Sequence, residues 1–243
     1  AWMEDGSKSF ILGTDIQGRD LLSTMIYGLR VSLLIGVGAV LFQAFVGILV
    51  GLFSGYLGGK LDSFLMRITD IQFSIPYLIV AIFTSAIFKL AFGVGRYAEL
   101  AVPLLIVIIG VSHWPIYART VRASVLGERN KEYVEAARVI GISRWQIMFR
   151  HVLPNTLTPV LVISTIQVAE AVMSEAALSF LGLGMPITKP SLGALIRSGF
   201  EYIFSGSWWI TFFPGVLLVI FLLVVLLLGD WLRDVLNPKL YKG

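Results

Sequence analysis

Residues 203–229 read IFSGSWWITFFPGVLLVIFLLVVLLLG and contain no ionisable side chain over 27 consecutive positions. About 20 apolar residues in a helix already cross the hydrocarbon core of a bilayer, which is about 30 Å thick. A helix in the core of a soluble protein rarely reaches this length. The stretch therefore predicts that the chain crosses a membrane.

The composition of the whole chain agrees with this prediction. Of the 243 residues, 57% are hydrophobic and only 14% are charged. Soluble domains usually have about 45–50% apolar residues and about 25% charged residues. The mean hydropathy is +0.85. These values exclude a soluble globular enzyme and a disordered chain. Cysteine is absent, which excludes a disulfide framework, a thiolate metal site and a cysteine nucleophile.

Five apolar stretches are long enough to be membrane spans, and they predict an all-α, polytopic transmembrane helical bundle. They cover residues 31–57, 75–92, 100–117, 157–183 and 210–229. Lys89 interrupts the end of the second stretch, from where its side chain can extend to the lipid headgroups. Because the number of spans is odd, the two termini are expected on opposite sides of the membrane.

Lysine and arginine in the short loops predict the orientation, because positively charged loops remain cytoplasmic. One side carries Lys60, Arg67, seven basic residues within 119–150 and three near the C-terminus, which makes twelve. The other side carries the remaining seven of the 19 basic residues. We therefore expect the C-terminus to be cytoplasmic and the N-terminus of this chain to lie outside.

One transmembrane domain is expected over residues 1–243. Residues 1–30 are expected to form an outer segment with an interfacial helix, and residues 31–118 three spans. Residues 119–156 are expected to form a cytoplasmic hairpin. Residues 157–243 are expected to form two spans with an outer loop and a cytoplasmic tail. Asp15 or Thr14 can cap the interfacial helix, whose apolar stripe lies within 21–29.

Four glycines of the first span are spaced by four and share one helix face, which lets another helix approach closely. They are Gly47, Gly51, Gly55 and Gly59. The approaching helix can belong to this chain or to a separate membrane subunit.

The segment 119–151 carries seven basic and three acidic residues, a sum of +4 that equals the net charge of the chain. It reads as two short amphipathic helices around Gly141, which supplies a left-handed position. Asn130 can cap the first helix, and Ser143 with Gln146 can form a capping box for the second.

The expected apolar positions are Tyr133, Ala136, Ala137 and Ile140 in the first helix and Trp145, Met148, Phe149 and Val152 in the second. Leu153-Pro154 is expected to end the hairpin before the next span. Glu135-Ala136-Ala137 forms a small, flat patch that suits a groove on a soluble partner. The alternative is a hairpin that packs only on its own bundle.

Glu135-Ala136-Ala137, Gly141 and Leu153-Pro154 together resemble the EAA loop of ABC importer permeases. Further motifs narrow the resemblance to the peptide/nickel type of permease, and to its second ("C") subunit. In chain order they are Leu12-Gly13-Thr14-Asp15, Gly18-Arg19-Asp20, LSFLGLG at 178–184, Pro190-Ser191-Leu192-Gly193, Phe213-Pro214-Gly215, Gly229-Asp230, Leu232-Arg233-Asp234 and Asn237-Pro238-Lys239. Asn237 departs from the pattern, because Asp is commoner there.

The resemblance implies a type I ABC importer permease in a bacterial plasma (inner) membrane. Its partners would be a second homologous permease subunit, two ATPase subunits that hold ATP and Mg, an outer substrate-binding protein and membrane lipid, without nucleic acid. The substrate would be a di- or oligopeptide, with nickel or another small solute as the alternative. Family members usually begin with one more helix, so six spans are expected in the complete protein.

By the same resemblance, the coupling to the ATPases would run through Glu135, Ala136, Ala137, Gly141, Leu153 and Pro154. The chain itself is expected to be no enzyme, because it contains no Walker A loop. We expect no cofactor in it. No metal site is expected either, because His113 and His151 are its only histidines.

Two carboxylates lie inside the fourth apolar stretch, where ionisable groups are costly unless they are paired or functional. Glu170 and Glu175 are five residues apart, roughly 140° around a helix, so they do not form one acid–base pair. Either is a candidate for the translocation path, and a structural role is the alternative. Two other classes of protein compete with this interpretation. One is an intramembrane enzyme that uses Glu170 or Glu175. The other is a secondary transporter, which usually has internal inverted repeats, and the sequence shows none.

Overall fold

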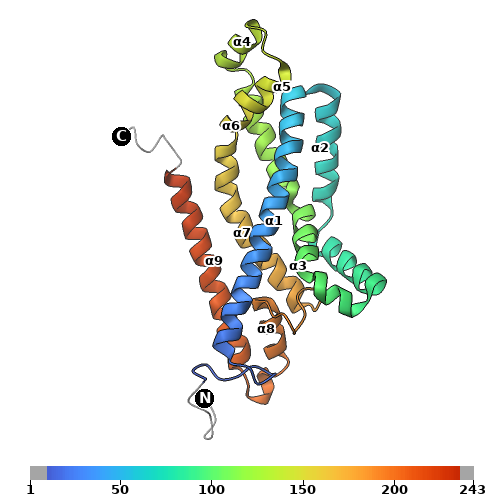
Figure 1. The fold of residues 1–243 in the computed structure, drawn as a ribbon, viewed down its shortest axis with the longest axis vertical. Coiled ribbons are helices and arrows are strands. Elements are labelled where there is room, and N and C mark those ends of the chain that lie inside the picture. The colour runs from blue at the N-terminus through green and yellow to red at the C-terminus, as the bar shows by residue number, and fades with distance from the viewer. Residues whose placement is uncertain (1–9, 236–243) are drawn as a thin grey trace. The chain divides into compact units, whose positions relative to one another are not determined.

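The computed structural model describes residues 10–235, which form helices joined by short loops (Figure 1). The motif Asn237-Pro238-Lys239 and the end of the expected cytoplasmic tail lie outside these residues. In chain order the helices are α1 (Leu21–Leu57), α2 (Gly59–Ser74), α3 (Tyr77–Glu128), α4 (Glu132–Val139), α5 (Arg144–Gln146), a π-helix (Ile147–Val152), α6 (Leu153–Asn155), α7 (Leu157–Phe180), α8 (Leu192–Phe200), a 3-10 turn (Ile203–Ser205) and α9 (Trp209–Val235).

Four of these helical segments are long and apolar enough to cross a membrane. They are Leu21–Leu57, Gly95–Glu128, Leu157–Phe180 and Trp209–Val235. A fifth span results if the bent pair Gly59–Ser74 and Tyr77–Gly93 is taken as one. The expected all-α, polytopic bundle is therefore confirmed.

The second span differs from the straight helix expected over residues 75–92. Ile75 has an extended backbone (φ −100°, ψ 120°) and ends α2, and Pro76 precedes α3. A proline disfavours helical geometry in the residue before it, so the chain bends here. The second span therefore includes the polar helix α2 if the bent pair is taken as one span, although hydropathy alone did not include α2.

Within the described residues the chain forms two compact units. Unit 1 comprises residues 10–39, 78–109 and 168–226, and unit 2 comprises residues 40–77, 110–167 and 227–235. The long helices α1, α3, α7 and α9 contribute residues to both units.

In unit 1, the start of α1 corrects two expectations. The helix runs from Leu21 to Leu57 without a break, so residues 21–29 form no separate interfacial helix. No proline interrupts 21–57, which explains the continuity. The Asp20 carboxylate caps the helix by accepting from the Ser23 hydroxyl and from the Ser23 backbone N–H, the latter at 2.9 Å, and these bonds, the hydroxyl's first, lower the pKa of Asp20. Asp15 instead pairs with Arg19 at 2.7 Å.

In unit 2, the glycine stripe packs against α3 of the same chain. A Cβ on Gly51 would lie 2.5 Å from the Ala118 carbonyl oxygen, and one on Gly47 would lie 2.6 Å from that of Trp114. Gly59 does not share this contact, because a Cβ there would meet nothing within 4 Å. The stripe is therefore a helix contact within this chain.

Candidate functional site

The hairpin, residues 129–156, joins α3 to α7 in unit 2. Its first helix α4 begins after Lys131, whose side chain makes no capping bond, so the expected cap by Asn130 is wrong. Gly141 ends this part with a φ of +85°, and the Ile142 N–H reaches back to the Ala137 carbonyl at 3.1 Å. A Cβ added to Gly141 would meet nothing within 4 Å.

The apolar face of α4 differs from the expected one. Val134 and Ala137 are buried, whereas the other three expected positions point outward. We call the exposed set the α4 surface. It consists of Tyr133, Glu135, Ala136, Val139 and Ile140. Val139 is 88% exposed and Ile140 is 77% exposed. The hairpin therefore buries only some of its apolar residues, and the described residues of this chain leave the α4 surface uncovered.

The second half of the hairpin is helical from Arg144 to Asn155, with a π-helix in its middle. Ser143 caps it as expected, since its Oγ accepts from the Gln146 N–H at 3.3 Å. A π-helix spans one extra residue per turn, which shifts the register of the side chains. As a result Ile147 is buried together with Met148 and Val152.

The two aromatic residues expected on this buried face lie outward instead. Trp145 and Phe149 are partly exposed and meet the ring of Phe53 edge-on, with centroids 6.1 and 6.2 Å away. Pro154 does not stop the helix, because it lies in the first turn of α6, where a missing N–H is tolerated. The break comes at Thr156, immediately before α7.

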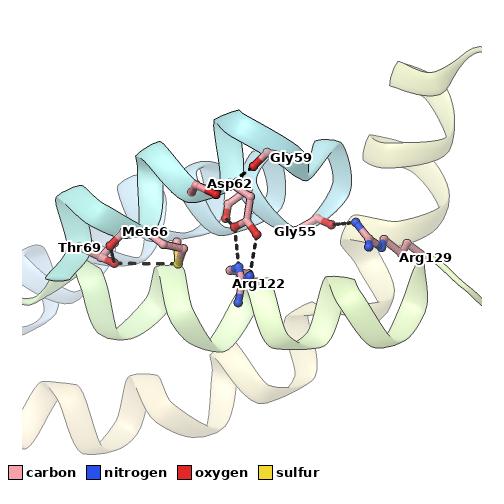
Figure 2. Close-up of polar contacts among 9 residues, drawn as sticks. Gly55, Gly59, Asp62, Met66, Thr69, Arg122 and Arg129 are labelled. Carbon is pink, nitrogen blue, oxygen red and sulfur yellow. Dashed lines mark hydrogen bonds and ion pairs between the residues drawn. The ribbon is translucent and has the colours of Figure 1, made fainter.

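A set of charged contacts, the α2–α3 clamp, joins α2 to α3 in unit 2, and Figure 2 shows its Arg122–Asp62 pair. The Arg122 guanidinium donates two hydrogen bonds to the Asp62 carboxylate, both at 2.6 Å. Ser54 of α1 donates to the same carboxylate. A second ion pair joins Arg119 to Asp70 at 2.7 Å. Bidentate arginine–carboxylate pairs combine strength with fixed geometry, so the clamp fixes α2 on α3.

The end of α3 is tied to α1 and to the hairpin. The Arg129 guanidinium donates to the Gly55 carbonyl at 2.7 Å, and Arg138 of α4 donates to the Arg129 carbonyl at 3.3 Å (Figure 2 shows the first of these). The Glu128 carboxylate accepts from Lys131 at 2.5 Å and from the Tyr133 hydroxyl at 2.8 Å. Partial burial, followed by this bond to Glu128, raises the pKa of Tyr133.

Sequence reasoning missed the clamp. Asp62 and Arg122 are 60 positions apart, and no local pattern pairs them. The available signal was the alternation of charges in residues 60–70, which is unusual beside an apolar span. They meet because α2 turns back along the C-terminal part of α1 (Figure 1), and the part of α3 that carries Arg122 packs on that same part of α1.

The two carboxylates of α7 are not brought together in unit 1. Glu175 has no exposed surface, and its carboxylate accepts from the hydroxyls of Ser32 at 2.8 Å and Ser179 at 2.6 Å. Ser191 extends this serine network by donating to Ser179 at 3.2 Å. Glu170 is exposed. Glu175 therefore links α1, α7 and the start of α8.

Within residues 10–235, no three side chains of His, Cys, Asp or Glu gather closely enough to hold a metal ion. His113 instead packs its ring against Tyr77, with centroids 5.0 Å apart.

Comparison with known proteins identifies the family. Residues 47–242, which include the α2–α3 clamp and the whole hairpin, match the model of the family described as "Binding-protein-dependent transport system inner membrane component". The chain belongs to this family. It is accordingly the permease component of an ABC importer.

Full-length relatives agree with the family match. The permease is 38% identical over 240 residues to the di/tripeptide transport system permease protein DppC of Pseudomonas aeruginosa, covering 99% of this chain and 76% of the relative. It is 39% identical to the dipeptide transport system permease protein DppC of Escherichia coli K12, with the same coverage. These relatives are transport permeases and not enzymes.

Solved structures agree on the fold. A chain of the inward-facing MetNI methionine ABC transporter matches with a TM-score of 0.70 at 23% identity, covering 89% of this chain and 98% of the other. A chain of a bacterial ABC transporter that imports alginate matches with a TM-score of 0.66 at 18% identity, covering 89% and 83%. The permease therefore has the fold of type I ABC importer permeases.

Proposed function

We propose that this permease forms part of the path by which a bacterial inner-membrane importer moves di- or oligopeptides into the cell, and that ATPase subunits drive it through the hairpin. The observation that carries the proposal is the α4 surface. Val139 and Ile140 expose most of their side chains on a polar, membrane-peripheral hairpin. Exposed apolar groups that cluster in this way mark an interaction site.

The hairpin is suited to transmit force because α4 is held at several points. Arg138 and Tyr133 tie it to the end of α3, and the α2–α3 clamp stiffens that end. A loosely held helix would absorb the motion of its partner. We therefore assign coupling to Glu135, Ala136, Ala137, Gly141, Leu153 and Pro154, with Gly141 setting the angle between the two halves of the hairpin.

The orientation and the partners follow from the same proposal. The basic hairpin faces the cytoplasm together with the C-terminus, and the loops of unit 1 near α8 face outward. The complete importer would add a second homologous permease subunit, two ATPases that bind ATP and Mg, and an outer binding protein that delivers the solute.

The peptide substrate is proposed because relatives that cover nearly the whole chain are named for dipeptide or di/tripeptide transport. Of the two carboxylates of α7, the exposed Glu170 is our candidate for the translocation path. The fully buried Glu175 has its oxygens bonded to serines and suits a structural role.

The test uses the assembled importer in proteoliposomes, with uptake of a labelled dipeptide and ATP hydrolysis measured together. Ile140→Asp and Glu135→Lys are expected to lower uptake at least about tenfold, because the first places an unmatched charge in the apolar contact and the second reverses the charge of the carboxylate beside it. Glu99→Lys reverses an exposed charge far from the hairpin in sequence and should leave both rates unchanged. Full uptake by both hairpin variants would refute the coupling role, and uptake of nickel but of no peptide would refute the substrate.

A further inference from the structure

A pocket in unit 1 is not used by the coupling mechanism. Its volume is about 260 Å³, and its walls come from α3, from the loop after α7 and from α8. Its charged or polar lining includes Lys89, Tyr97, Arg197 and Glu201. Whole small-molecule ligands usually occupy about 300–1,000 Å³. The pocket therefore fits one end group of a larger ligand.

Two cations share this pocket. The Lys89 ammonium donates to the Gly182 carbonyl at 2.6 Å and lies 4.5 Å from the centre of the Tyr97 ring. The Arg197 guanidinium packs against Gly182, where a Cβ would overlap with it. In the part of the chain that the structure describes, neither cation forms an ion pair with a carboxylate within 4 Å.

Like charges held together without a counter-ion are costly, especially when one of them is half-buried, as Lys89 is. Glu201, which also lines the pocket, offsets one of the two charges, which leaves a sum of +1 from Lys89, Arg197 and Glu201. This sum suits the binding of one singly charged anion.

The loop that shapes the pocket is held by several hydrogen bonds, and it contains the end of the LSFLGLG stretch, whose first three residues belong to α7. Gly182 adopts a φ of +82°, and the Leu183 N–H bonds back to the Leu178 carbonyl at 2.9 Å. The Tyr97 hydroxyl donates to the carbonyls of Leu183 and Gly184, the latter at 3.0 Å. The φ of Gly182 disfavours any residue with a side chain, and a Cβ there would also force the guanidinium end of Arg197 to move.

We propose that this pocket binds the C-terminal carboxylate of the transported peptide between Arg197 and Lys89. Arginine presents paired N–H donors that match a carboxylate, and the ammonium has donors left after its bond to Gly182. The tight volume admits the end group but not a whole peptide. This inference rests on the proposed function, because it takes the substrate to be a peptide and unit 1 to open outward near α8.

The test measures equilibrium binding of radiolabelled alanyl-phenylalanine and of its C-terminal amide to the assembled transporter in nanodiscs, without the binding protein. The wild type should bind the free acid about tenfold more tightly than the amide, the size expected for a charge-assisted bond. Arg197→Gln and Lys89→Gln should each remove this preference. Lys89→Gln keeps a donor for the Gly182 carbonyl, so it serves if Arg197→Gln fails to assemble.

Arg96→Gln makes the same chemical change at an exposed arginine outside the pocket and should retain the preference. Equal binding of acid and amide by the wild type, or no binding of either, would overturn the inference. So would variants that keep the preference. Dipeptide uptake by the complete system is measured in parallel, and its absence would refute the proposed function instead.

Discussion

Asp62 is the residue on which the α2–α3 clamp depends, because it accepts from arginine and serine at once. Its side chain is 18% exposed and that of Arg122 is 33% exposed. The outer pair, Arg119 and Asp70, is 49% and 57% exposed. Solvent screens exposed ion pairs strongly, so such pairs contribute little to stability. The two pairs should therefore differ in their effect, because the inner pair is both less exposed and bidentate, although both join an arginine to an aspartate.

Asp62→Asn is expected to lower the stability of the permease by about 1–3 kcal/mol, since it leaves the partly buried Arg122 without its charged partner. Asp70→Asn is the matched control and should cost at most about 1 kcal/mol. Thermal unfolding of the purified complex in detergent measures both. Equal losses for the two variants would contradict the idea that burial of the inner pair makes the difference.

Prediction from sequence at the residue scale succeeded where the cause is local. Gly141 and Ser143 act through their own backbone or their nearest neighbours, and both were predicted correctly. The cap at Asp20 was missed because Asp15 offers the same chemistry five positions earlier. The partners of Asp62 and Glu175 were also missed, since their bonds join segments far apart in the chain.

The helix α4 shows what a periodic pattern can and cannot predict. The positions of Tyr133, Ala136, Ala137 and Ile140 fit one helical face, but the structure buries Val134 and Ala137. With eight residues, α4 has two overlapping apolar stripes. The periodic pattern alone does not predict which of the two stripes is buried against the rest of the chain. The exposed stripe is the more informative one, because it is available to a partner.

Tyr133→Phe tests how firmly α4 is held. The variant removes the donor to Glu128 and the acceptor for Asn155, and one hydrogen bond contributes about 1 kcal/mol. Local opening of residues 132–139 should then become about fivefold more frequent. Amide hydrogen exchange of this helix measures the change.

Tyr202→Phe removes a similarly exposed hydroxyl in unit 1 and serves as the control. Exchange in α4 should be unaffected by it. If Tyr133→Phe also left the exchange of α4 unchanged, the anchoring of this helix would have to come from its buried Val134 and Ala137 alone.

At the scale of the whole molecule, hydropathy predicted the class of fold and the approximate positions of four spans. It failed at the second span because Pro76 bends the chain and because α2 is too polar to be counted. The division into two units was not visible in the sequence, since the long helices cross from one unit to the other without any change in composition.

The chain has no cysteine, so single cysteines can test the proposed orientation. Glu132→Cys, at an exposed hairpin position outside the α4 surface, should react with a membrane-impermeant maleimide only after the cells are permeabilised. Phe204→Cys, at a position that is 96% exposed in unit 1, should react in intact spheroplasts. The opposite pattern at both sites would reverse the topology and separate the hairpin from cytoplasmic ATPases.

The open space around Gly141 has a stereochemical consequence. An added Cβ would touch nothing, so the only obstacle to a side chain is the φ of +85°, which costs an L-residue about 1–2 kcal/mol. A D-alanine has no such cost, and it would also reduce the freedom of the unfolded chain. The bend of the hairpin therefore selects its central residue by handedness and not by volume.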